Sequence, residues 1–151
     1  MPLPQITVET LIDFYVEKFG ALLKTEMGND YIIRIYKTMT AEVSVIPKML
    51  VGVVVINRAS TTNISIGKDA YQENYILEFY IGINTNESEL KRAVNQIINY
   101  IKRKDFEFDL MTNFSDVIGA INSNWYVETN YDNEYRFHIA KISVDFFVVK
   151  V

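Results

Sequence analysis

The chain has no cysteine, one histidine and six glycines, none of them adjacent, among its 151 residues. The absence of cysteine excludes disulfides, thiolate metal sites and cysteine nucleophiles. A single histidine excludes any site that requires two. The isolated glycines form no loop that could cradle a phosphate. The sequence therefore offers no cofactor or metal motif, and we expect neither in this protein.

Long apolar runs and excess positive charge are also lacking. No segment approaches the roughly 20 apolar residues of a membrane helix, and the first ten residues lack the basic start and apolar stretch of an export signal. The net charge is −4 and the pI about 5.0, whereas a duplex-DNA binder usually carries a basic stripe. We expect a cytosolic chain without a membrane partner, unless an assembly carries it elsewhere.

Hydrophobic residues are abundant, at 49% of the chain, and include ten tyrosines and nine phenylalanines. This content is enough for one core, and the length predicts a single domain over residues 1–151. Tyrosine suits half-buried sheets and subunit interfaces alike. The aromatic content leaves both interpretations open.

Two segments show helical periodicity. Leu11, Tyr15 and Phe19 recur at helical spacing, and the helix is expected to stop at residues 28–30. Thr10 with Asp13 resembles its capping box, and Thr7 is the alternative cap. The second helix carries an apolar stripe with Asn86 or Thr85 as its cap, and the stripe consists of Leu90, Val94, Ile97 and Ile101.

Strand patterns fill most of the remaining chain. Alternating or continuous apolar residues predict strands at 31–36, 41–46, 49–56, 75–83, 106–110, 125–129 and 135–149. Residues 58–74 are polar and are expected to form a long hairpin arm or loop, and residues 113–124 a loop or short helix. In the last strand the apolar phase shifts, which predicts a bulge near Ala140 or a far end covered on both faces.

These elements predict an α+β fold. We expect one domain with a mostly antiparallel sheet, flanked by the N-terminal helix and the central amphipathic helix, with the polar arm at about 58–74.

Three groups of chemically active residues are candidates for a site. Asp105, Glu107 and Asp109 would line one face of a strand about 6–7 Å apart, which suits a divalent cation or simply a solvated face. His138 could act as a lone base, or it could be an ordinary strand residue. The third group is the basic side and end of the second helix, which could contact nucleic acid or solvent; it comprises Lys91, Arg92, Lys102, Arg103 and Lys104.

The order of elements resembles a known family. The chain runs from an N-terminal helix, LIDFYVEKFGALL, through a hydrophobic strand and polar arm to YILEFYIGINTNESELKRAVNQIINYIK, a strand, turn and long helix. The long strand YRFHIAKISVDFFVVKV closes the domain. This layout resembles the tail terminator (tail-completion or neck) proteins of long-tailed bacteriophages and phage-tail-like particles.

The resemblance implies a structural protein and not an enzyme. Such a protein would form a hexameric ring that caps the tail tube, stops its polymerisation and docks the head-tail connector. DNA would pass through the ring without specific binding, and the protein would reside in the virion after assembly in the host cytoplasm. The residues expected at interfaces lie in the arm and near the last turn; they are Thr61, Ile64, Ile66, Tyr71, Trp125 and Tyr126.

Three other functions remain open. The chain could be another tail or connector subunit, such as a tube or head-completion protein. It could be a small ligand-binding or regulatory domain. It could also be a metal-dependent nuclease-like enzyme that uses Asp105, Glu107 and Asp109.

Overall fold

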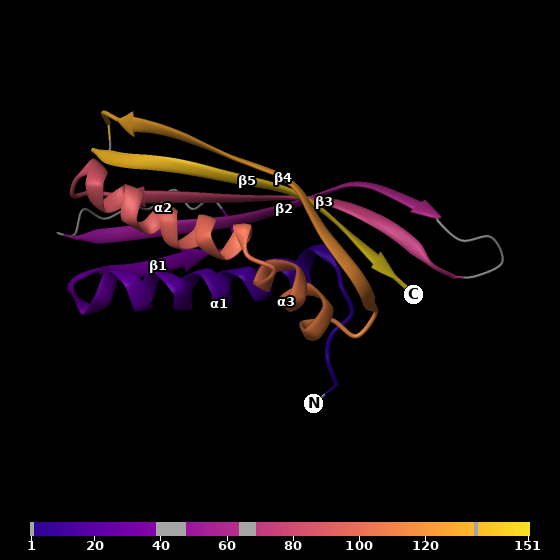
Figure 1. Ribbon diagram of the computed structural model, residues 1–151. Helices are drawn as coiled ribbons and strands as arrows, with labels where there is room; N and C mark the ends of the chain where they lie inside the picture. Colours follow the sequence, from indigo (N-terminus) through magenta and orange to yellow (C-terminus); the bar gives the residue numbers. More distant parts are fainter. Residues whose placement is uncertain (1, 39–47, 64–68, 135) are drawn as a thin grey trace.

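The computed structural model describes residues 2–38, 48–63, 69–134 and 136–151. The predicted α+β class is confirmed: in this part, helices pack on a mostly antiparallel sheet (Figure 1). In chain order the elements are α1 (Val8–Met27), a 3-10 turn η1 (Gly28–Asp30), β1 (Ile32–Tyr36), β2 (Met49–Asn63), β3 (Tyr71–Ile83), α2 (Glu87–Lys102), α3 (Asp105–Asn113), β4 (Val117–Asp132) and β5 (Phe137–Lys150). No helix in these ranges is long and apolar enough to cross a membrane.

The described strands form one sheet in the order β1-β2-β3-β5-β4. β1 runs parallel to β2, and every other neighbouring pair is antiparallel. The strands predicted at 31–36, 49–56 and 75–83 are confirmed, while the one predicted at 41–46 lies outside the described residues. β4 is the last strand in the sheet order and forms one edge of the described sheet.

The helices cover one face of this sheet and bury the core against it. Phe19 of α1 meets Phe79 of β3 at a ring-centroid distance of 4.6 Å, and Phe106 of α3 meets Phe146 of β5 at 5.3 Å. All four rings are at most 2% exposed. Burying a large apolar side chain stabilises a fold by about 1.5–3 kcal/mol, so this layer holds the domain together.

The helix N-termini follow from their capping residues. The Thr7 hydroxyl accepts from the Thr10 amide at 3.1 Å, and the Thr10 hydroxyl accepts from the Thr7 amide at 2.8 Å. The capping box is therefore Thr7 with Thr10, and the pairing of Thr10 with Asp13 was wrong. At α2 the predicted cap is confirmed, because Asn86 accepts from the Glu89 amide at 3.0 Å.

Residues 106–110 are helical, so the strand predicted there is wrong. The alternation of Phe106, Phe108 and Leu110 is typical of a strand. In α3, however, Phe106 and Leu110 are fully buried, and Phe108 is 60% exposed. Residues four apart share one face of a helix, and a residue two apart points elsewhere. Burial of this i, i+4 pair against the core decides for the helix.

β4 begins at Val117, so the loop or short helix predicted for 113–124 is wrong over most of its length. The segment contains the turn-favouring residues Asn122, Ser123 and Asn124, which obscure the strand pattern. Two irregularities in its pairing with β5, at 117/119 and 122/124, interrupt the alternation further. The long partner strand β5 imposes the extended conformation.

The apolar phase shift in β5 has a different cause from the predicted bulge. The ladder between β3 and β5 runs without a register shift from Tyr71 to Ile83, so Ala140 is not bulged. Phe137 instead lies on the face away from the helices and is 4% exposed. It packs over Gly82, where an added Cβ would approach the Phe137 ring to 3.3 Å. The face of β5 away from the helices is thus covered at the start of the strand, at Phe137, and not at the far end, where Phe147 and Val149 are half-buried.

Candidate assembly surfaces

The arm predicted at 58–74 is a hairpin made by the ends of β2 and β3. Ser60 to Asn63 pair with Asn74 to Tyr71, and the hairpin projects beyond the helices at one end of the molecule (Figure 1). Thr61 is exposed and Tyr71 is half-buried opposite Lys150 of β5. Ile64 and Ile66 lie outside the described residues. Of the predicted arm contacts, the structure therefore places Thr61 and Tyr71 on the same projecting hairpin.

Polar contacts anchor the base of this arm. The Glu73 carboxylate is 3% exposed, accepts a short hydrogen bond from the Tyr75 hydroxyl and forms an ion pair with Lys150 at 2.9 Å. Asn74 Nδ2 donates to Ser60 Oγ at 2.8 Å across the hairpin. A buried carboxylate requires such partners. The arm is therefore tied to β5 where it leaves the domain.

The other two predicted interface residues lie on β4, at the opposite side of the sheet. Trp125 points to the helix-covered face, where Lys102 Nζ lies 5.2 Å from its ring centroid. Tyr126 points to the other face and is 45% exposed. The predicted residues thus form two separate surfaces, the arm and β4.

β4 and the adjacent α3 carry most of the exposed large apolar side chains among the described residues. They are Phe108 and Met111 on α3 and Ile118, Ile121, Tyr126 and Tyr131 on β4. Sequence reasoning named only Tyr126 among these six as an interface residue. It missed the first four because it assigned α3 to a strand and the start of β4 to a loop. An excess of exposed apolar side chains is a feature of protein contact sites. This side of the molecule is the stronger candidate for an interface.

α3 covers only the first part of the outer edge of β4. Glu107 Oε1 accepts from the Asn122 amide at 3.2 Å, and Asn122 Nδ2 donates to the Ile101 carbonyl at 3.1 Å. Beyond this point, residues 123–131 have no strand partner other than β5 in the described part of the chain. An unpaired strand edge is a template for another strand.

A basic pocket of about 450 Å³ opens beside this edge. Its lining includes Lys102, Arg103 and Lys104 at the end of α2 together with Asn122 and Trp125 of β4. The Asn122 Oδ1 atom is buried and has no hydrogen-bond partner among the described residues. The pocket joins positive charge to the apolar β4 surface, a combination that suits contact with a protein partner.

The acidic residues at 105–109 do not form the row along one strand face that the sequence predicted. On α3, Asp105 and Asp109 share one face and Glu107 points elsewhere, and no cluster of three possible metal ligands exists among the described residues. The Asp109 carboxylate accepts from the Tyr100 hydroxyl at 2.6 Å and pairs with Lys18 Nζ at 3.4 Å. The predicted row of three carboxylates required a strand, and it does not exist because these residues form a helix.

Burial controls the protonation of the tyrosines beside Asp109. It raises the pKa of Tyr15 well above its ordinary value, and the charge of Asp109 raises it further. The pKa of Tyr100 is also raised, first by burial and then by Tyr15 and Asp109. Tyr100 therefore remains a hydrogen-bond donor at neutral pH, and Asp109 belongs to an internal polar network.

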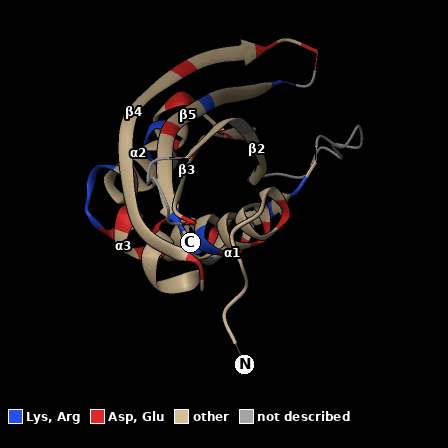
Figure 2. Cartoon of the chain, turned by 90° about the vertical axis from the view of Figure 1, so that its right-hand side faces the viewer, with Lys and Arg blue, Asp and Glu red and all other residues tan. Residues whose placement is uncertain are grey.

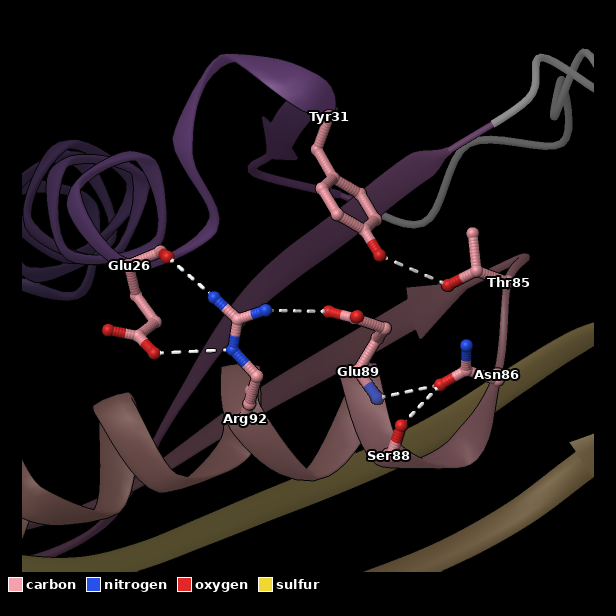
Figure 3. Close-up of polar contacts among 7 residues, drawn as sticks. All are labelled: Glu26, Tyr31, Thr85, Asn86, Ser88, Glu89 and Arg92. Atoms are coloured by element: carbon pink, nitrogen blue, oxygen red, sulfur yellow. Dashed lines mark hydrogen bonds and ion pairs between the residues drawn. The ribbon is translucent and has the colours of Figure 1, made fainter.

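Two of the five basic residues on the side and end of the second helix, Lys91 and Arg92, pair with acidic residues. Arg92 binds the end of α1 through the Glu26 carbonyl at 2.9 Å and carboxylate at 3.3 Å, and it also pairs with Glu89 at 3.0 Å (Figure 3). Lys91 pairs with Glu87 at 3.6 Å. The contacts between Arg92 and Glu26 connect α2 to α1, which favours the structural interpretation of Arg92 over nucleic-acid contact.

His138 contacts Tyr131 across the β4–β5 pair, with the ring centroids 4.8 Å apart and the rings tilted by 54°. It is half-buried near the turn between these strands. Acidic segments dominate this end of β4 and the following turn (Figure 2), and they contain Glu128, Asp132 and Glu134. His138 is a residue of β5 that packs against Tyr131, which favours its interpretation as an ordinary strand residue.

No protein-family model matches the sequence, and no curated protein matches it.

Proposed function

We propose that this chain is a structural subunit that assembles into a ring, as a terminator of a phage tail or phage-tail-like particle does. The observation that carries the proposal is the pair of contact surfaces on opposite sides of one sheet: the projecting β2–β3 arm and the partly uncovered, apolar edge of β4. Two different surfaces on opposite sides of a subunit generate head-to-tail contacts, which close into a ring when the rotation between neighbours is suitable.

The order of elements adds support, because the helix, arm, strand–helix unit and closing strand that resemble the terminator family are all elements of the fold. In this function the ring caps the tail tube in the virion and receives the connector, and DNA passes through its channel. The net charge of −4 would limit adhesion of the DNA to the ring.

The test is the mass of the purified protein in solution, measured by native mass spectrometry or light scattering over a concentration series. We expect a discrete ring, with a hexamer as the expected order, or a monomer that becomes a ring when the tail tube protein of the same particle is added. Long tubes formed by this chain alone would identify a tube subunit instead. A monomer at every concentration, unchanged by the tube protein, would refute the proposal.

A further inference from the structure

Two strand edges of comparable length lie on opposite sides of the sheet. On β4, residues 123–131 pair only with β5 in the described ranges. On β2, the pairing with β1 ends at Val53, and residues 54–62 pair only with β3 among the residues that the structure describes. At about 3.3 Å per residue each segment spans roughly 30 Å.

The directions of these strands suit pairing between two copies. β2, β3, β5 and β4 are each antiparallel to the next, so β2 and β4 run in opposite directions within one sheet. The ladders place Thr61 level with Ala120 of the same copy. The two free edges therefore meet when neighbouring copies are staggered along the strands, as strands tilted from a ring axis are, and this stagger leaves the strand directions opposed. β2 of one copy would therefore meet β4 of the next copy as an antiparallel neighbour, the geometry that joins adjacent edges with perpendicular hydrogen bonds.

Charge favours this pairing over contact between two β4 edges. β4 contains Glu128 and Asp132 but no lysine or arginine, whereas β2 contains no aspartate or glutamate. Pairing β4 with another β4 would bring only acidic residues together, and like charges across an interface oppose association. Pairing with β2 avoids this repulsion.

We propose that the outer edge of β2, residues 54–62, adds to the outer edge of β4, residues 123–131, of a second copy of this chain. The sheets of neighbouring copies would then be continuous around the ring, and the arm would act as the element that reaches the neighbour. This inference rests on the proposed ring and names the surfaces that build it.

The alternation of side chains makes the pairing testable. Thr61 lies in register with Glu73 and Val148, so it points to the helix-covered face, as do Val127, Thr129 and Tyr131 of β4. Glu128 and Asn130 point to the opposite face. Directly opposed residues of antiparallel strands have Cβ atoms about 4.5–5.5 Å apart, close enough for a disulfide after small adjustments.

The experiment introduces cysteines into this naturally cysteine-free chain. Thr61→Cys is mixed with a second protein that carries one cysteine at Val127, Thr129 or Tyr131, and with matched controls that carry it at Glu128 or Asn130. Each mixture is oxidised under conditions that give the ring, and cross-linked dimers are quantified by non-reducing electrophoresis. We expect one position on the helix-covered face to cross-link at least about tenfold more than the controls, since side chains on opposite faces cannot meet.

The outcomes separate this inference from the proposed function. A ring that forms without any such cross-link, or one that cross-links equally on both faces, would overturn the strand pairing and leave the ring intact. Efficient cross-linking of the Thr129→Cys protein with itself would show β4–β4 pairing and also overturn it. Absence of a ring in the mass measurement, with or without tube protein, would refute the proposed function itself.

Discussion

Phe79 and Phe106, on the helix-covered side of the sheet, are completely buried, whereas Ile121 and Tyr126 on β4 are 50% and 45% exposed. Both regions are rich in apolar side chains. The first is closed by α1, α2 and α3, and the second is left open at the side of the sheet. The apolar residues of this chain thus form two sets: the inner set stabilises the monomer, and the outer set is exposed on β4. Substitutions in the two regions should therefore have different consequences.

The largest effect is expected from Phe106→Ala. Phe106 contacts the rings of Tyr15, Tyr100 and Phe146, and its removal leaves a cavity in the core. We expect the free energy of unfolding to fall by about 3–5 kcal/mol, measured by urea denaturation. Phe108→Ala on the exposed face of the same helix is the matched control, and we expect it to change stability by less than about 0.5 kcal/mol. Equal losses from both variants would contradict the division between the regions.

A smaller loss is expected from Gly52→Ala. An added Cβ would lie 2.6 Å from Ile35 Cδ1 and 2.7 Å from the Phe79 ring, so the β1–β2–β3 region must shift. The expected cost is about 1–3 kcal/mol in urea denaturation. Gly119→Ala on β4 is the control, because its Cβ would lie 3.8 Å from Val149. A stable Gly52→Ala variant would show that this side of the core is loosely packed.

The free energy of unfolding should fall at alkaline pH because of two buried tyrosines. The folded-state pKa values of Tyr15 and Tyr100 are raised above the ordinary value of 10.0, so above that pH the unfolded state releases protons that the folded state retains. The stability present below pH 10 is therefore lost as the pH rises. We expect Tyr100→Phe to weaken this loss, measured as the free energy of unfolding from pH 8 to 11. An unchanged pH dependence would contradict the assignment to Tyr100.

The smallest effect on stability, and the largest on assembly, is expected from Ile121→Ser. Ile121 is half-exposed on β4, so its replacement should change the free energy of unfolding by less than about 0.5 kcal/mol. If β4 is an interface, the same substitution should weaken ring formation, seen as a shift of the ring to higher protein concentration in light scattering. If the variant forms the ring at the same protein concentration as the unmodified protein, Ile121 is not part of the interface.

The candidate surfaces were only partly predictable. Thr61, Tyr71, Trp125 and Tyr126 were inferred from a polar arm and a late turn, and the structure places them on the arm and on β4. Which of these segments remained uncovered depended on the order of the strands. That order arises from pairing between segments distant in the chain, such as β3 with β5, for which local periodicity carries no signal.

The sequence by itself determined the elements whose local pattern has a single reading. In α2 the Asn86 cap and the apolar stripe agree, and in β3 the alternation from Tyr75 to Ile83 matches the burial of every second residue. Agreement between local signals and tertiary burial made these elements recognisable from composition and spacing alone.

Only the tertiary structure decided which residues between 105 and 124 form a helix and which form a strand. The alternation in α3 was compatible with a strand until burial of Phe106 and Leu110 on one helical face selected the helix. The start of β4 contains turn-favouring residues, and its pairing with β5 outweighs their local preference. Where two local conformations are nearly equal in free energy, the contacts with distant segments select between them, and those contacts exist only in the folded chain.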